Sequence, residues 1–319
     1  MEPPPKPRNA PFAFLFGRRC NTLDDWPPPR PRRLTNLINQ FSLLARNDRG
    51  TGQVPHYIII EVFTMQLFDS HAHYDDRRFD QDRDALLRSL ANHNVAYVAN
   101  IGSDLPSSRK SVALAEQYDF IYAAVGVHPH NADEMVPGDL EALEALMTHP
   151  KVRALGEIGL DYHYDFSPRM VQMERFAQQL ELAERLKCPV VIHEREATRD
   201  CLDILRRYDI AIGVFHCYSG SLETAKTLID WGWHLSFTGV ITFSNAKKAR
   251  EVIAWMPAER LMIETDCPYL TPEPFRGKRN ESTKLIHTLR AVADIRGISE
   301  EEAARLTTDN ALRFYDIVG

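Results

Sequence analysis

From Met65 onward, short apolar runs alternate with longer amphipathic stretches. Runs of strand length occur at 66–70, 95–101, 121–127, 152–158, 189–193, 210–216, 234–240 and 261–265. The stretches between them have helical length. The clearest one begins at Ser167-Pro168, which indicates a cap followed by proline in the first helical position, and it stops before Pro189. Eight strand-and-helix repeats predict a closed parallel (β/α)8 barrel of the TIM type, with right-handed crossovers.

The first 64 residues do not share this alternation. They hold ten of the twenty prolines, including two runs of three, and their periodicity is too weak to predict a core. Clustered Arg and Pro fit a nucleic-acid-binding tail or an organellar transit sequence, but the proline runs and the pair Asp24-Asp25 argue against an amphipathic transit helix. We therefore divide the chain into an extension at 1–64, disordered or a start-site artefact upstream of Met65, and a barrel at 65–319.

Charge and cysteine content restrict the environment and the partners. Residues 65–319 carry 29 basic and 39 acidic side chains, so the predicted barrel lacks the basic excess typical of proteins that grip long duplexes. No run of eighteen apolar residues predicts a membrane span. The five cysteines show no paired framework, which fits a reducing compartment. We expect a cytoplasmic protein with no membrane association and no obligate protein partner.

Five of the predicted strands stop on residue types that bind metals. The candidates are His71, His73, Glu157, His193, His216 and Asp266. Side chains at i and i+2 of a strand share a face, so His71 and His73 can chelate one cation. Because parallel strands of a barrel end at one face, all six should converge there. Imidazole with carboxylate suits Zn, Mn, Fe, Ni or Co, and Mg is possible. The set predicts a binuclear hydrolytic metal centre.

Simpler interpretations of single residues stay open. A lone His-x-His is more often core or surface histidine than a ligand pair, and Asp266 could instead cap a helix before Pro268. Cys217 and Cys267 adjoin proposed ligands. A thiolate ligand is conceivable there, but strand alternation should point both side chains away from the site.

Seven segments, taken in order, resemble the TatD family of metal-dependent deoxyribonucleases over about residues 65–319. They are Phe68-Asp69-Ser70-His71-Ala72-His73, Gly126-Val127-His128-Pro129-His130, Gly156-Glu157-Ile158-Gly159-Leu160-Asp161-Tyr162, Pro189-Val190-Val191-Ile192-His193, Phe215-His216-Cys217-Tyr218-Ser219-Gly220, Glu264-Thr265-Asp266-Cys267-Pro268-Tyr269-Leu270 and Arg276-Gly277-Lys278-Arg279-Asn280-Glu281. Seven motifs in one order are far more specific than any single motif.

The resemblance implies a ligand set and a mechanism. One cation is held by His71, His73, Glu157 and Asp266, and a second by Glu157, His193 and His216, so Glu157 bridges. The implied cofactors are two divalent cations, Mg, Mn or Zn, which activate water for phosphodiester hydrolysis. Asp266 accepts the proton of that water. Asp266 and Glu157 are thus the predicted catalytic residues.

The predicted substrate-binding residues are His128, Arg195, Arg276, Lys278 and Arg279. His128 and His130 fit a packing or capping role about as well, and the cations fit an ordinary solvated charge run. Two positions depart from the family pattern, Glu194 beside the site and Ser282 in place of a proline that would stiffen its loop. We expect Glu194 to weaken or shift substrate binding and the Ser282 change to be tolerated.

With an acidic barrel, the expected activity is a 3′-5′ exonuclease acting on single-stranded DNA or strand ends, with DNA or a nucleotide as its partner. Amidohydrolase-like cleavage of a C–N, ester or aminoacyl-tRNA bond is the alternative. Many amidohydrolases bridge their metals with a carboxylated lysine at the fourth strand, where this chain has Glu157. A binding protein with structural metals fits least, because this ligand set leaves coordination positions open.

Overall fold

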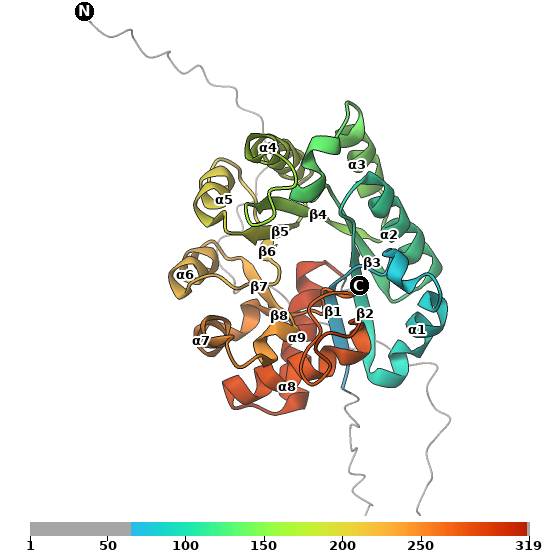
Figure 1. Ribbon diagram of the computed structural model, residues 1–319, viewed down its shortest axis with the longest axis vertical. Coiled ribbons are helices and arrows are strands. Elements are labelled where there is room, and N and C mark those ends of the chain that lie inside the picture. Colours follow the sequence, from blue (N-terminus) through green and yellow to red (C-terminus); the bar gives the residue numbers. More distant parts are fainter. Residues whose placement is uncertain (1–64, 318–319) are drawn as a thin grey trace, which may run out of the picture. The chain divides into compact units, whose positions relative to one another are not determined.

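A computed structural model describes residues 65–317, so the predictions for residues 1–64 lie outside the described residues. Eight strands form one sheet in sequence order, and every neighbouring pair is parallel (Figure 1). The strands are β1 (Leu67–Ala72), β2 (Val95–Ile101), β3 (Ile121–Val125), β4 (Val152–Asp161), β5 (Val190–Arg195), β6 (Gly213–Phe215), β7 (His234–Phe237) and β8 (Leu261–Ile263). The predicted TIM-type barrel is confirmed.

Backbone contacts between β1 and the segment after β8 bring the ends of the sheet together. The amide of Asp266 donates to the carbonyl of His71 (2.9 Å), and the amide of His73 donates to that of Cys267 (2.8 Å). A parallel bridge joins Ala72 to Cys267. The barrel is therefore nearly closed, and these bonds lie beside the candidate ligands of β1.

Helices surround the strands (Figure 1). They are α1 (Arg83–Ser89), α2 (Leu105–Gln117), α3 (Asp139–Met147), α4 (Arg169–Leu186), α5 (Thr198–Leu205), α6 (Leu222–Asp230), α7 (Lys247–Trp255), α8 (Leu285–Arg296) and α9 (Glu300–Phe314). Short 3-10 helices are η1 (Arg77–Phe79), η2 (Leu90–His93), η3 (Pro129–Glu134), η4 (Gly239–Thr242), η5 (Ala258–Arg260) and η6 (Ser282–Lys284). Within residues 65–317, no helix is long and apolar enough to cross a membrane.

The chain's own polar residues fix several helix starts. Asp104 and Ser107 form a capping box at α2, where each side chain binds the other's backbone amide. Ser221 caps α6 and Ser299 caps α9 through their hydroxyl oxygens. These caps satisfy amides that have no partner inside the helix.

The barrel interior is a packed core. Phe68, Val191 and Met262 project into it from the strands, and Phe314 and Tyr315 reach it from the end of α9. The Tyr315 hydroxyl donates to the carbonyl of Ser70 (2.8 Å), so α9 is tied to the inside of β1. A filled lumen leaves the C-terminal ends of the strands as the place for a site.

Some predicted boundaries were wrong. β4 runs three residues past the predicted end at Ile158, so Glu157 lies inside a strand and Asp161 ends it. Pro168 is the N-cap of α4 rather than its first residue. The Ser167 hydroxyl does not cap α4, because it donates to Asp133 Oδ1 (2.7 Å). The pairing of β4 with β5 as far as Arg195 supplies the bonds that prolong β4.

Candidate metal centre

The C-terminal end of β1 delivers two imidazoles to one point, His71 within the strand and His73 just after it. The Nε2 atoms of His71 and His73 are 3.1 Å apart, as the i and i+2 spacing predicts. His73 Nδ1 lies 2.9 Å from the carbonyl oxygen of Ile101, which can only accept, so Nδ1 carries the proton. In neutral His73 the lone pair is then on Nε2 and faces His71. This is the arrangement that two imidazole ligands of one cation need.

Glu157 lies between two pairs of imidazoles. Its Oε1 is 2.7 Å from His193 Nδ1 and 2.7 Å from His216 Nε2. Its Oε2 is 3.3 Å from His71 Nε2 and 3.8 Å from His73 Nε2. Each carboxylate oxygen thus serves a different pair, which is the geometry of a bridging ligand.

A second carboxylate orients His193. Asp161 Oδ2 accepts from His193 Nε2 (3.0 Å), so the lone pair of the neutral ring is on Nδ1, facing Glu157. Gly159 permits this approach: its φ is +145°, and a Cβ there would lie 1.9 Å from the carbonyl oxygen of His193. Any other residue would push β4 away from β5.

Glu264 lies against the other side of His216, at an ion-pair distance rather than in hydrogen-bond geometry. Its Oε1 lies 3.3 Å from His216 Nδ1 and accepts the Cys217 amide at 2.6 Å. The other nitrogen of His216 then faces Glu157. The rings of His216 and His71 stack with centroids 4.0 Å apart, which brings the two pairs of imidazoles into one cluster.

Asp266 completes the first pair. Its Oδ1 is 3.3 Å from His73 Nε2 and 3.8 Å from His71 Nε2. The residue adopts a φ of +53°, in the left-handed region, just after β8. The side chain of His71 is fully buried, whereas those of Asp266, His73 and His193 are 14 %, 13 % and 16 % exposed, so solvent reaches the cluster at these three residues.

The pKa values of three carboxylates in the site are lowered. Burial raises the pKa of Glu157, but the neighbouring imidazoles of His216, His128 and His71 outweigh it and bring the pKa well below its usual range. Burial also raises the pKa of Asp161, and hydrogen bonds from His130 and His193 more than reverse that effect. The pKa of Asp266 is lowered as well, because its hydrogen bond with His73 and the nearby imidazoles outweigh desolvation.

His128 lies against the cluster, and His130 connects to it. His128 Nε2 is 3.5 Å from Glu157 Oε1, while its Nδ1 accepts the amide of His130 (3.1 Å) and so caps η3. That bond leaves the proton of neutral His128 on Nε2, which makes it a donor toward the site rather than a ligand. His130 Nε2 donates to Asp161 Oδ2 (3.0 Å). His128 therefore caps η3 and also lies beside Glu157, and its predicted contact with substrate stays a prediction.

The four predicted cations lie in different surroundings. Arg195 is exposed at the end of β5, with its guanidinium 4.8 Å from the centroid of the Tyr164 ring. Arg276 and Lys278 are exposed, and Arg276 packs on Phe243. Arg279 donates two hydrogen bonds to Asp82 (2.8 and 2.6 Å). Among the described residues, no hydrogen bond or ion pair joins these four side chains to the metal-ligand candidates.

The two departures from the family pattern have local explanations. Glu194 Oε1 accepts the amide of Ala197 (2.8 Å), the residue before α5, so its carboxylate is used in a turn. The Ser282 hydroxyl donates to buried Asp69 (2.6 Å), and its amide donates to the hydroxyl of Tyr74 (3.0 Å). A proline could make neither bond, so hydrogen bonds hold this loop where a proline ring would stiffen it.

Asp161 and Glu264 were not predicted as site residues, although both stand in the quoted motifs. The available signal was position: Asp161 ends the longer β4, and Glu264 directly follows β8. Carboxylates beside metal-binding histidines commonly orient the rings. Their contacts reach His193 and His216 at the ends of other strands, which spacing along the chain could not show.

The donor set fits divalent cations. Two groups of ligand candidates bring their atoms within 4.8 Å of one another, namely His71 with His73 and Glu157, and His71 with His216 and Asp266. A third such group joins Glu157 and His193 to His128, the histidine whose Nδ1 accepts the amide of His130. Within residues 65–317, no such group includes a cysteine. Cys217 Sγ instead lies 3.6 Å from the Thr238 hydroxyl, and Cys267 is buried. Borderline cations prefer this mixture of imidazole and carboxylate.

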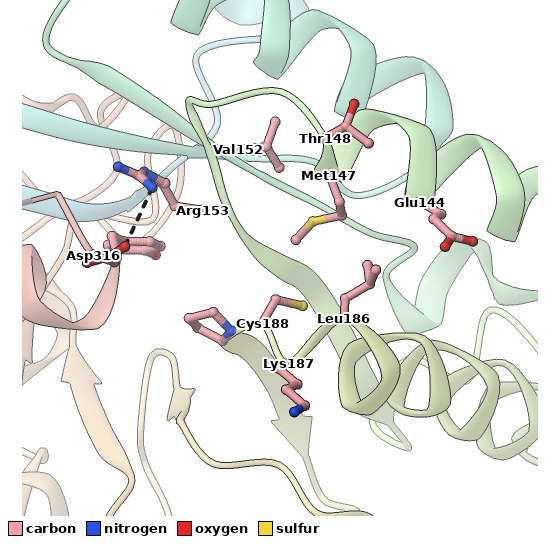
Figure 2. A pocket seen from close by; sticks show the side chains of 11 residues that line it. Glu144, Met147, Thr148, Val152, Arg153, Leu186, Lys187, Cys188 and Asp316 are labelled. Carbon is pink, nitrogen blue, oxygen red and sulfur yellow. Dashed lines mark ion pairs between the residues drawn. The ribbon is translucent and has the colours of Figure 1, made fainter. Parts of the chain in front are cut away.

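A cavity of about 350 Å³ lies elsewhere, beside the starts of β4 and β5 and the ends of α3 and α4 (Figure 2). Figure 2 shows Arg153 and Asp316 facing each other in it, with 3.8 Å between Nη1 and Oδ2. Its lining contains none of the ligand candidates. In a parallel barrel the starts of the strands form the face opposite the site.

The barrel and the imidazole–carboxylate cluster at its C-terminal face define a metal-dependent hydrolase. The profile of the family described as TatD related DNase matches residues 68–316. The chain belongs to this family, as its motifs predicted.

Relatives extend over the whole barrel. The uncharacterized metal-dependent hydrolase YabD of Bacillus subtilis is 42% identical over 253 residues, covering 79% of this chain and 99% of that protein. The 3′-5′ ssDNA/RNA exonuclease TatD of Salmonella typhimurium is 32% identical, covering 79% of this chain and all of that protein. The crystal structure of YjjV, a TatD homolog from Escherichia coli, superposes with a TM-score of 0.76 at 30% identity, covering 80% and 99%.

Proposed function

We propose that this protein is a deoxyribonuclease that removes nucleotides from the 3′ end of single-stranded DNA with two divalent cations. The position of Glu157 carries the proposal, because its two oxygens face different imidazole pairs, His193 with His216 and His71 with His73. The name of the Salmonella relative supports the substrate class and the polarity. The acidic barrel favours strand ends over long duplexes.

His71, His73, Glu157 and Asp266 would hold one cation, and Glu157, His193 and His216 the other. Such cations supply positive charge that polarises a phosphoryl oxygen and makes water more acidic. Asp266 is partly exposed to solvent and its pKa is lowered, so it is suited to accept a proton from the attacking water. His128 would donate its Nε2 proton toward the substrate or Glu157.

The test is hydrolysis of a 5′-labelled single-stranded oligonucleotide by the full chain, after chelation and reconstitution with Mg, Mn or Zn. The expected product is a ladder shortened from the 3′ end, and RNA of the same sequence tests the wider substrate class. Glu157→Gln should abolish the ladder and reduce the bound metal counted by mass spectrometry. Glu259→Gln is the matched control, because Glu259 is exposed on η5, before the start of β8.

Several outcomes would contradict the proposal. Absence of hydrolysis with any of the three cations at high enzyme concentration, while two cations are bound, would reject the nuclease and favour the alternative hydrolases. Esters, cyclic amides and aminoacyl-tRNA would then be assayed. A Glu157→Gln variant that keeps full activity would reject the bridging role of Glu157.

A further inference from the structure

An exposed pair of aromatic rings lies in the loop between β4 and α4, on the same face as the metal-ligand candidates. Tyr164 is 49% exposed and Phe166 is 66% exposed. Their rings stack with centroids 5.3 Å apart and planes 22° apart. Large exposed apolar groups that adjoin one another commonly mark a binding surface. We call Tyr164 and Phe166 the aromatic pair.

The aromatic pair is held by the same residues that orient the site. His130 contacts both rings edge-on, with centroids 5.4 Å from Tyr164 and 4.8 Å from Phe166. Asp161 Oδ1 accepts the amide of Tyr164 (2.9 Å), and its Oδ2 accepts from His130 and His193 (3.0 Å each). One buried carboxylate therefore connects the start of this loop, the ring that supports the pair, and a metal-ligand candidate.

A cation accompanies the pair. The guanidinium of Arg195 lies 4.8 Å from the centroid of the Tyr164 ring, two residues after His193 on β5. Arg195 is exposed and forms no ion pair with any residue in the described range 65–317. Its charge is therefore available to an anion beside the site.

We propose that the aromatic pair stacks an unpaired nucleobase of the substrate, with Phe166 as the main contact and Arg195 binding an adjacent phosphate. The inference rests on the proposed function and adds the residues that select single-stranded substrate. A nucleotide combines a flat ring with an anion, which matches two rings and a free guanidinium better than a lipid or an apolar peptide does. A base in a duplex is stacked on its neighbours and unavailable, whereas single strands readily stack on exposed aromatics.

The experiment combines a protein change with a substrate change. Phe166→Ala should raise KM for a single-stranded oligonucleotide by about 5- to 150-fold, the range for losing one stacked base, and leave kcat nearly unchanged. Phe166→Leu should raise KM by as much, because leucine keeps the apolar area but has no ring. Phe166→Trp should keep KM near the wild-type value. Trp255→Ala is the matched control, since Trp255 is 41% exposed at the end of α7, which faces away from the site.

An abasic residue, moved one position at a time through the last four nucleotides, identifies the stacked base. At one position, the abasic residue should raise the KM of the wild type by the same factor by which Phe166→Ala raises KM on intact DNA. At that position it should not raise the KM of Phe166→Ala any further. The proposal would be overturned if the abasic residue and Phe166→Ala multiplied their effects on KM at every position. It would also be overturned if Phe166→Ala had the same KM as Trp255→Ala.

Binding separates this proposal from the proposed activity. With cations removed by chelation, 2-aminopurine placed in turn at each of the last four positions should lose fluorescence at one of them on binding to the wild type but not to Phe166→Ala. A protein that quenches 2-aminopurine in this way and cleaves no oligonucleotide would support the aromatic pair and reject the nuclease. A protein that cleaves DNA without this difference in quenching would reject the aromatic pair alone.

Discussion

Replacing Asp161 by Asn tests how the fold prepares His193 for a cation. Asp161 is fully buried, and its two oxygens accept four hydrogen bonds, from the amides of His163 and Tyr164 and from the rings of His130 and His193. An amide keeps one accepting oxygen and introduces an NH₂ group. In either orientation of the amide, two N–H donors then face the NH₂ group.

His193 can avoid facing one N–H donor with another by moving its proton from Nε2 to Nδ1, the atom 2.7 Å from Glu157. That atom is then no longer free to bind a cation. Loss of such an orienting carboxylate typically reduces metal affinity by about 10- to 100-fold. Each buried donor left unpaired costs about 1–3 kcal/mol. We therefore expect weaker binding of the cation assigned to His193 and His216, and a lower free energy of unfolding.

The assay is titration of chelated protein with Zn or Mn, followed by calorimetry, with the tautomer of His193 read from the nitrogen chemical shifts of its ring. Asp200→Asn is the matched control. Asp200 accepts one hydrogen bond, from the Tyr162 hydroxyl (2.8 Å), and an amide oxygen can still accept it. An Asp161→Asn protein whose cation affinities stay within about twofold of wild type, below the range for an orienting carboxylate, would show that Asp161 does not prepare His193 for a cation.

Three further predictions concern stability. Chelation should lower Tm, and re-added cation should restore it, because a cation at a hundred times its Kd stabilises the folded chain by about 2.7 kcal/mol. A Tm that does not depend on cation would contradict a site that exists only in the folded chain. Ser282→Ala should lower the free energy of unfolding, measured in urea, by about 1.5–3 kcal/mol, because buried Asp69 loses a hydrogen bond. An unchanged free energy of unfolding would show that this hydrogen bond does not stabilise the protein. Burial and the charges of Arg260 and Arg313 lower the pKa of His234 to about 3. Between that pH and about 6.5, the unfolded chain takes up a proton that the folded chain does not. The free energy of unfolding should therefore fall as pH decreases through this window, by at most about 1.4 kcal/mol per pH unit. His234→Phe should reduce that slope in urea titrations, and an identical slope would refute it.

Much of the barrel could be predicted from the sequence. Apolar runs placed all eight strands, because buried parallel strands are almost continuously hydrophobic and the helices between them have their own period. His71 and His73 converge because a strand repeats every two residues, a purely local rule. The convergence of Glu157, His193, His216 and Asp266 also followed, since parallel strands of a barrel share one C-terminal face.

Local patterns were least reliable where distant segments decide the outcome. β4 continues past Glu157 because β5 pairs with it, and Ser167 leaves the helix cap because Asp133 binds it. The guanidinium of Arg279 pairs with Asp82 across nearly two hundred residues of sequence, a contact that no local pattern indicates, and its predicted role in substrate binding stays a prediction. Such pairings depend on the closed sheet rather than on neighbours in the chain.

Local periodicity and the order of motifs suffice to predict the repeating strand-and-helix architecture, the family and the residue types that converge at one face. They do not predict which nitrogen of His193 is free, which oxygen of Glu157 meets which imidazole, or that Asp161 joins His193 to His130 and the aromatic pair. Those features are set by distances of a few ångströms between strands, and hydrogen-bond directions at that scale exist only once the barrel has closed.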